Sequence, residues 1–198
     1  TDVDDKIINR AIEEEVTEAE IAKKYLEYFL ECNQLLNALP FNKMPKVTEN
    51  MEEMIDFIHA LVERGYAYAV EGDVYFRIDK VREYGQLSGK RIEELEVGAR
   101  IAEDSKKENP LDFVLWKKTD KGITWDSPWG AGRPGWHTEC VVMIQKEFKG
   151  KIDIHGGGTD LQFPHHENEI AQSLCMHGHS IANYWMHVGR LGLNNEKM

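Results

Sequence analysis

The stretch "HGGGTDLQFPHHENE", residues 155–169, holds residue types that could bind a ligand or a metal ion. A helix that begins with Pro164 in its first turn would carry His165 and Glu169 four positions apart. Side chains at that spacing share one helix face, about 6 Å apart, so both can reach a single ion. His166 would turn to the adjacent face and need not join them. A polar helix start with acids near the positive end of the helix dipole is the ordinary alternative.

A third donor, Cys140, comes at the start of the predicted helix "TECVVMIQKEF". In doubly wound folds, helix starts follow the carboxyl ends of strands, where sites gather. Cys140, His165 and Glu169 together suit zinc better than magnesium or calcium, because thiolate and imidazole are soft or borderline ligands. Three ligands leave a tetrahedron incomplete, so a fourth ligand is expected outside this chain, or water or substrate fills the position.

The three glycines follow a predicted strand, residues 151–155, and allow the backbone to turn sharply and approach a ligand. A phosphate loop and a plain strand-to-helix turn both stay open. His155 and Asp160 flank the glycines at the carboxyl end of this strand, where α/β proteins bind ligands. Trp136, just before the candidate cysteine, could close over a small substrate or anchor the core.

Hydrophobic periodicity supplies the elements that would position these residues. Thr17 and Glu20 form a capping-box pattern ahead of an apolar stripe. A third helix ends at Gly65, and aromatic and β-branched residues on both sides of residues 71–73 predict a hairpin. From Thr138 onward the pattern is helix, strand, glycine loop, helix and strand, the last over residues 184–193. The sequence therefore predicts a parallel α/β fold with the hairpin region inserted. The stripe runs through Ile21, Ala22, Tyr25, Leu26, Phe29, Leu30 and Leu36.

The bulk composition is that of an ordinary soluble globular protein, with 198 residues, 41% hydrophobic and 30% charged. No apolar run approaches the roughly 20 residues that span a bilayer, so no membrane partner is expected. The net charge of −11 argues against a surface made mainly for nucleic acid. A local basic track at Lys117, Lys118 and Lys121 stays open. The first residue, Thr1, and a last residue within a polar run suggest a piece of a longer chain.

The three cysteines are odd in number and widely spaced, which disfavours a disulfide framework and fits a reducing, cytoplasmic setting. Cys175 lies six residues past Glu169, roughly 240° around the helix, and is expected to face the core. Cys32, within the second helix, is expected to be core as well.

Several ordered blocks together resemble cysteinyl-tRNA synthetases, which are class I aminoacyl-tRNA ligases. The blocks are "TDVDDKIINRA", "NPLDFVLWK", "GRPGWHTEC", "DIHGGGTDLQFPHHENEIAQS", "YWMH" and the terminal "EKM". The resemblance implies part of a class I Rossmann-like parallel sheet with an inserted α+β connective region that contains the hairpin. It divides the chain into the end of the first catalytic half (1–46), the insertion (47–125) and the second half (126–198).

The family's zinc is held by two cysteines, a histidine and a glutamate, and Cys140, His165 and Glu169 match the last three. The resemblance implies that the first cysteine and the histidine-rich ATP signature lie upstream of Thr1. The second ATP signature stops after Lys197 and Met198. It also implies that four residues line the cysteine and adenylate pocket: Thr1, Trp136, His155 and Asp160.

The implied activity is cysteine–tRNA ligation, in which ATP with Mg²⁺ activates cysteine and tRNA(Cys) accepts it. Zinc would select the substrate, because a hydrophobic pocket offers only about 1–3 kcal/mol for so small a difference as cysteine and serine. Accuracy of roughly 10⁴ to 10⁵ needs about 5.5–7 kcal/mol. The isolated chain is expected to be inactive, since both ATP signatures are incomplete. The alternatives are a related ligase that joins cysteine to an amino sugar in mycothiol synthesis, and a stand-alone zinc-binding module.

Overall fold

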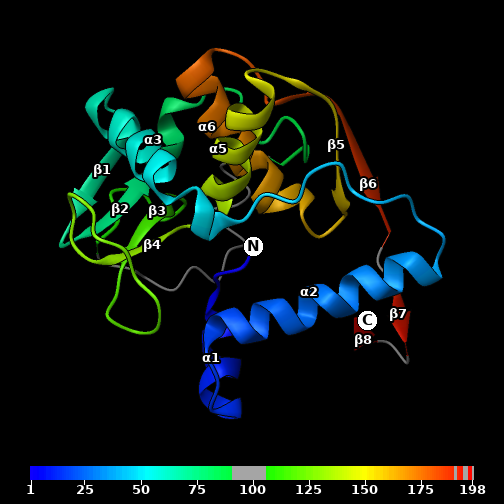
Figure 1. Cartoon of the computed structure of the whole chain (residues 1–198). Coiled ribbons are helices and arrows are strands. Elements are labelled where there is room, and N and C mark those ends of the chain that lie inside the picture. Colours follow the sequence, from blue (N-terminus) through cyan, green and yellow to red (C-terminus); the bar gives the residue numbers. More distant parts are fainter. Residues whose placement is uncertain (91–105, 190, 194–195, 198) are drawn as a thin grey trace.

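The computed structural model describes residues 1–90, 106–189, 191–193 and 196–197. Residues 91–105, 190, 194–195 and the terminal Met198 lie outside this description. In Figure 1, the helices α3 (Met51–Glu63), α5 (Trp136–Phe148) and α6 (Glu167–His177) lie between an antiparallel sheet and a pair of parallel strands. The chain is thus of the α/β class.

The antiparallel sheet has the order β1-β2-β3-β4. It is formed by β1 (Ala67–Val70), β2 (Asp73–Phe76), β3 (Phe113–Lys118) and β4 (Gly132–Pro134). The predicted hairpin is confirmed, with Glu71 at φ 53° and Gly72 at φ 95° in the turn between β1 and β2. The division of the chain into 1–46, 47–125 and 126–198 stays a prediction, and the sheet itself continues past residue 125 into β4.

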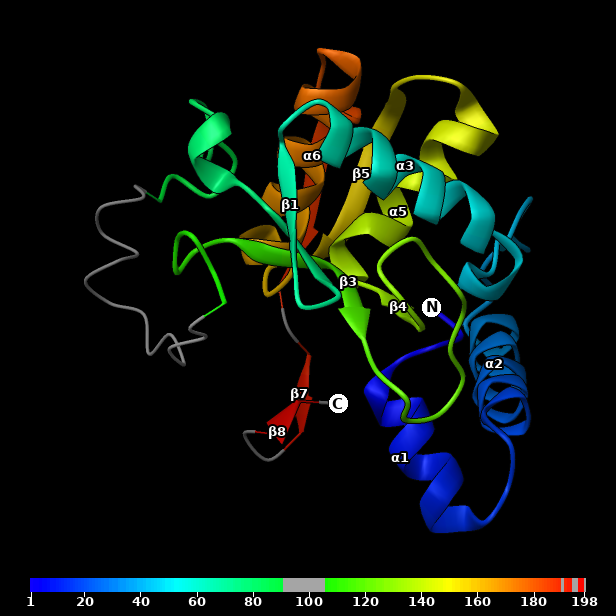
Figure 2. The ribbon, with the colours of Figure 1, turned by 90° about the vertical axis from the view of Figure 1, so that its left-hand side faces the viewer.

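The parallel pair consists of β5 (Ile152–Gly158) and β6 (Ala182–Val188), seen beside each other in Figures 1 and 2. The three glycines were predicted to form a loop, and this is wrong. They continue β5 and pair with residues 186–188 of β6, because a glycine without a side chain still makes the ladder's backbone hydrogen bonds. The predicted strand 184–193 is shorter than expected, since β6 ends at Val188 and Gly192–Leu193 form β7, which pairs with β8 (Glu196–Lys197).

The core joins α3, the antiparallel sheet, α5 and α6. Met54, Ile58 and Leu61 on one face of α3 are fully buried, which is the three- and four-residue periodicity of the sequence. The short 3₁₀ turns Val47–Glu49 and Ile78–Lys80 contribute buried residues at either end of this region. Further members of the core are Val47, Val74, Phe76, Ile78, Leu115, Trp116, Val141 and Ala171.

Helices α1 (Asp5–Glu14) and α2 (Glu18–Leu35) lie apart from the three central helices and are connected by a short turn (Figures 1 and 2). The capping box is confirmed, with Glu20 N–H bonded to the Thr17 hydroxyl and the Glu20 carboxylate accepting from Thr17 N–H. Of the members of the apolar stripe of α2, only Ile21 is buried. Its other large side chains are exposed or half-buried, because no described element packs over most of this face.

Cys175 and Cys32 were both expected to lie in the core, and the expectation is confirmed for Cys175 but wrong for Cys32. Cys175 is half-buried and packs against the core, and burial raises the pKa of its thiol to about 11. Cys32 was expected to be core, but it is exposed on α2 for the same reason as the stripe. Within the part of the chain that the structure describes, no helix has the length and apolar character needed to cross a bilayer.

Two glycines with positive φ provide a matched test of the hairpin. A Cβ at Gly72 would lie 2.9 Å from the Trp129 carbonyl oxygen, whereas a Cβ at Gly65 (φ 77°) meets nothing within 4 Å. We expect Gly65→Ala to cost about 1–2 kcal/mol of unfolding free energy, from left-handed strain alone. Gly72→Ala should cost about 1–3 kcal/mol more, because overlap adds to the strain. Urea unfolding of both variants measures the difference, and equal losses would contradict it.

Candidate functional site

Helix α5 begins where β4 ends, and its start is fixed by Gly135. A Cβ at this residue would overlap the backbone carbonyl of Val114 on β3, so only glycine allows the helix to start so close to the sheet. The Gln172 side chain then links α5 to α6. Its amide nitrogen donates to the carbonyl oxygens of His137 (2.8 Å) and Asn168 (3.0 Å), and its oxygen accepts from the Thr138 hydroxyl at 2.9 Å. The bonds to His137 and Thr138 set the relative position of the two helices, whereas the bond to Asn168 lies within α6.

This arrangement brings Cys140 of α5 to His165 and Glu169. The possible ligand atoms of the three residues all lie within 4.8 Å of one another. Glu169 is fully buried and His165 is 4% exposed, while Cys140 is half-buried. His165 Nε2 lies 3.0 Å from Glu169 Oε1, so the side chains four apart do share one face. The backbone differs from the prediction, because residues 162–166 form an irregular turn and α6 begins only at Glu167.

A second group lies on the other side of the same carboxylate. His155 Nε2 is 2.6 Å from Glu169 Oε2, and the ligand atoms of His155, His166 and Glu169 also lie within 4.8 Å of one another. His166 was expected to turn to the adjacent face; it lies outside the group of Cys140 and His165 but belongs to this second group with Glu169, and its Nδ1 is 2.8 Å from His187 Nε2. Glu169 is therefore shared between a cysteine–histidine side and a purely histidine side.

The electrostatics of the site centre on Glu169. Burial acts to raise the pKa of its carboxyl, but the contacts with His155 and His165 outweigh burial and lower this pKa to about 2. The group is thus a carboxylate at neutral pH. Both oxygens are buried, yet neither is aligned with a donor for a hydrogen bond. Such a carboxylate is stabilised by a cation placed between it and its neighbours.

The neighbouring groups fit a divalent metal ion. Burial, together with the charge of Glu169, raises the pKa of the Cys140 thiol well above its ordinary value, so without a cation the thiol stays protonated. Burial lowers the pKa of His137 and of His166 to about 4, which leaves both imidazoles neutral. The imidazole of His165, the carboxylate of Glu169 and the Cys140 thiol, which a metal can ionise, form the donor set of a borderline-soft ion.

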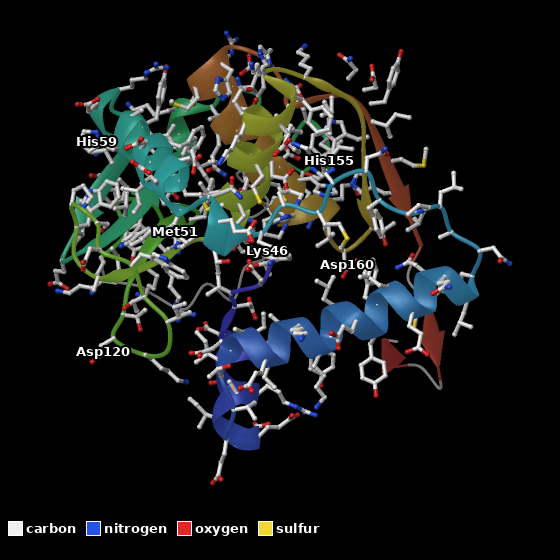
Figure 3. All side chains as sticks on the ribbon, viewed as in Figure 1. Lys46, Met51, His59, Asp120, His155 and Asp160 are labelled. Carbon is white, nitrogen blue, oxygen red and sulfur yellow. The ribbon has the colours of Figure 1, made fainter. Side chains whose placement is uncertain are left out.

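The other predicted site residues differ in how close they lie to the two ligand groups. Trp136 stacks on His165, with ring centroids 4.0 Å apart and planes at 23°, and it is 46% exposed, so it covers the cluster and is not a core anchor. It also lines a cavity of about 460 Å³ together with His137 and Phe163. His155 lies within β5, whereas Asp160 follows the end of the strand, is exposed and belongs to neither ligand group (Figure 3).

Three further expected residues lie away from the cluster or outside the description. The hydroxyl oxygen of Thr1 is 3.3 Å from a carboxylate oxygen of Glu139, the residue next to Cys140, so Thr1 reaches only the edge of the site. Lys197 belongs to the short strand β8, and Met198 is outside the described residues.

Four residues with aromatic rings lie in the site but were not predicted from the sequence as site residues. His137 Nδ1 lies 2.9 Å from His165 Nδ1, and Trp185 stacks on His155 with centroids 4.6 Å apart. His166 and His187 complete the group. One signal was present: Trp185 and His187 are two apart in a predicted strand, and therefore lie on one face of it.

Gly157 explains why glycines occupy the end of β5. A Cβ there would lie 2.7 Å from His166 Cε1 and 3.0 Å from its Nε2. The neighbouring Gly156 has only the Met186 carbonyl oxygen near, at 3.9 Å. The glycine at 157 thus leaves room for an imidazole rather than for a phosphate in the described geometry.

Comparison with known proteins agrees with this architecture. Residues 1–198 match the family described as the class I (C) tRNA synthetase catalytic domain, and the chain belongs to that family.

Three curated relatives match the chain over its whole length. The chain is 54% identical over 198 residues to the cysteine–tRNA ligase of Acholeplasma laidlawii, covering all of this chain and 46% of that protein. The cysteine–tRNA ligases of Carboxydothermus hydrogenoformans (54%, 43% of its length) and Streptococcus pneumoniae R6 (53%, 45% of its length) also match over the whole chain. The chain therefore spans less than half the length of these relatives.

Adjacent glycines allow a direct test of the crowding at His166. We expect Gly157→Ala to lower the unfolding free energy by about 1–3 kcal/mol and to displace the His166 ring, because the added methyl overlaps it. Gly156→Ala is the control, since its methyl enters open space. Urea unfolding and crystal structures of both variants measure these effects, and an unmoved His166 in Gly157→Ala would contradict the close approach.

Proposed function

We propose that the protein to which this chain belongs is a cysteine–tRNA ligase, in which ATP activates cysteine and the cysteinyl group passes to tRNA(Cys). The observation that carries the proposal is the cluster of Cys140, His165 and Glu169. The Glu169 carboxylate in this cluster is buried, and its oxygens lack aligned donors. Family membership and relatives named cysteine–tRNA ligase over the whole chain support the same reading.

In this proposal Cys140, His165 and Glu169 hold a zinc ion, with a further ligand supplied from outside the chain. When bound, zinc supplies a Lewis acid that takes up a thiolate at neutral pH far better than an alcohol. Glu169 compensates positive charge from within the core. The His165 ring stacks on Trp136, which covers it from one side.

The two reaction steps need the substrates to be correctly positioned more than they need a nucleophile from the protein. A carboxylate oxygen of cysteine attacks the α-phosphorus of ATP, the bond to the β-phosphate breaks, and pyrophosphate leaves. The terminal ribose hydroxyl of the tRNA then attacks the acyl carbon, and AMP leaves. Proximity and charge stabilisation account for such steps. Trp136 and His155 are proposed to line the pocket from two sides, with Thr1 and Asp160 at its edge and Lys197 and Met198 belonging to an ATP signature.

Mg²⁺ is proposed as the companion of ATP, and the cytoplasm as the location, because tRNA and ATP are used there in translation. The basic residues considered as a nucleic-acid track are partly engaged: Lys117 Nζ lies 2.7 Å from Asp73 and Lys121 Nζ lies 2.7 Å from Asn9. The described residues therefore give no preference for where the tRNA lies.

Substitution of the cluster tests the proposal in the protein at its full natural length. Cys140→Ser and Glu169→Gln should each lose bound zinc and lower cysteine-dependent pyrophosphate exchange at least about 100-fold. Breaking a buried ionic contact costs about 3–5 kcal/mol, and each 1.4 kcal/mol is tenfold. Elemental analysis and exchange assays with cysteine and serine provide the measurements.

Cys32→Ser is the matched control, because Cys32 is exposed on α2 and makes no contribution to the cluster. It should keep both zinc and activity. Unchanged zinc content in Cys140→Ser and Glu169→Gln would overturn the ligand assignment, and an intact metal site without cysteine–tRNA formation by the wild type would overturn the activity.

A further inference from the structure

The backbone that carries His165 is irregular and needs support from outside itself. Within the turn Gln162–His166, Phe163 has extended dihedral angles (φ −138°, ψ 131°), so the turn does not run smoothly into α6. The N-cap residue of α6, His166, makes no side-chain capping hydrogen bond. A regular helix would fix its own first turn through such bonds, and this one does so incompletely.

A second segment supplies the missing contacts. Residues 84–90, "YGQLSGK", which we name the strap, lie against the turn and the first residues of α6. The Gln162 amide nitrogen donates to the Leu87 carbonyl oxygen at 2.8 Å, and the Tyr84 hydroxyl donates to Asn168 Oδ1 at 2.6 Å. The Lys90 ammonium lies 4.2 Å from the centroid of the Phe163 ring.

Glu167 makes the central contact between the strap and α6. Its carboxylate is 1% exposed and accepts the backbone N–H groups of Leu87 (Oε1, 3.4 Å) and Ser88 (Oε2, 3.0 Å). Among the described residues, no lysine, arginine or histidine pairs with it. Since burying a carboxylate is costly, the strap amides are what compensates its charge, together with the positive end of α6.

The strap is itself closed into a compact shape. Gly85 has φ 96°, and a Cβ there would overlap the carbonyl oxygen of Lys90. The two ends of the strap therefore come together only because residue 85 is glycine. A closed strap presents the Leu87 and Ser88 amides as a fixed pair of donors.

We propose that Glu167 is a positioning residue, which ties the strap to α6 and so holds His165 and Glu169, two residues to either side, in the geometry that binds the metal ion. This inference rests on the metal site of the proposed function. Groups that orient metal ligands from behind typically contribute about 10–100-fold in metal affinity. Tyr84 acts in the same way through Asn168, one residue further along.

Two substitutions remove these contacts with little change of volume. Glu167→Gln replaces one carboxylate oxygen by an NH₂ group, which then faces a backbone N–H of the strap. Tyr84→Phe removes one hydroxyl. The control is Tyr68→Phe in the antiparallel sheet, because the Tyr68 hydroxyl also donates from a buried site, to Asp112 Oδ2 at 2.8 Å, and it accepts from the Glu108 N–H at 2.6 Å as well.

The experiment measures zinc transfer to a chromophoric chelator from the full-length protein, with KM for cysteine, KM for ATP and the thermal midpoint. Glu167→Gln and Tyr84→Phe should weaken zinc retention about 10–100-fold and raise KM for cysteine more than KM for ATP. Tyr68→Phe should lower the thermal midpoint at least as much as Tyr84→Phe, because its hydroxyl makes two hydrogen bonds, but keep wild-type zinc retention.

Wild-type zinc retention in Glu167→Gln and Tyr84→Phe would overturn the inference, and so would equal zinc loss in Tyr68→Phe and Tyr84→Phe. If Glu167→Gln does not fold, Tyr84→Phe decides alone. Glu169→Gln, measured in parallel, separates the two proposals: zinc loss there with none in Glu167→Gln removes only the role of the strap. Zinc retention in Glu169→Gln removes the metal site itself and the strap's role with it.

Discussion

The site depends on one constraint, a carboxylate that is ionised and fully buried. Glu169 lies between Cys140 and His165 on one side and His155 and His166 on the other, and neither of its oxygens is aligned with a donor. An ionised group in such a position is tolerated only if positive charge comes to it. Since the pKa of His166 is lowered to about 4, this imidazole does not bring that charge at neutral pH. The groups on both sides of this carboxylate offer ligand atoms to a cation, and the cysteine–histidine side adds a thiol.

The rest of the structure holds that carboxylate in place from several directions. Gln172 links α5 to α6 through two hydrogen bonds, to the Thr138 hydroxyl and the His137 carbonyl oxygen, which fixes Cys140 relative to Glu169. Gly157 on β5 lets the His166 ring approach the parallel strands closely. Because each contact belongs to a different element, the site exists only when the central helices, the parallel pair and the irregular turn have all formed. Local sequence patterns alone do not produce it.

The cysteine–histidine side could be predicted because it depends mostly on local geometry. His165 and Glu169 share a helix face by their spacing, and Cys140 was indicated by its position at a helix start. The α/β class likewise follows from the periodicity. On the histidine side, His155 was predicted as a site residue, whereas Trp185 and His187 were missed because their place depends on which residues of β5 and β6 lie opposite each other. His155 pairs with Trp185 and Gly157 with His187, and this register is a tertiary property that neither strand encodes alone.

Two wrong expectations have a common cause. The glycines at 156–158 were predicted to form a loop and Cys32 of α2 to lie in the core, because composition and periodicity describe what a segment can do rather than what lies next to it. Glycine usually weakens a strand, yet at position 157 the absence of a side chain leaves room for the His166 ring. An amphipathic helix such as α2 shows that an apolar face exists, while whether Phe29 or Leu30 is buried depends on a neighbour. Gly157, a residue that is unusual within a strand, thus indicates the position of the site.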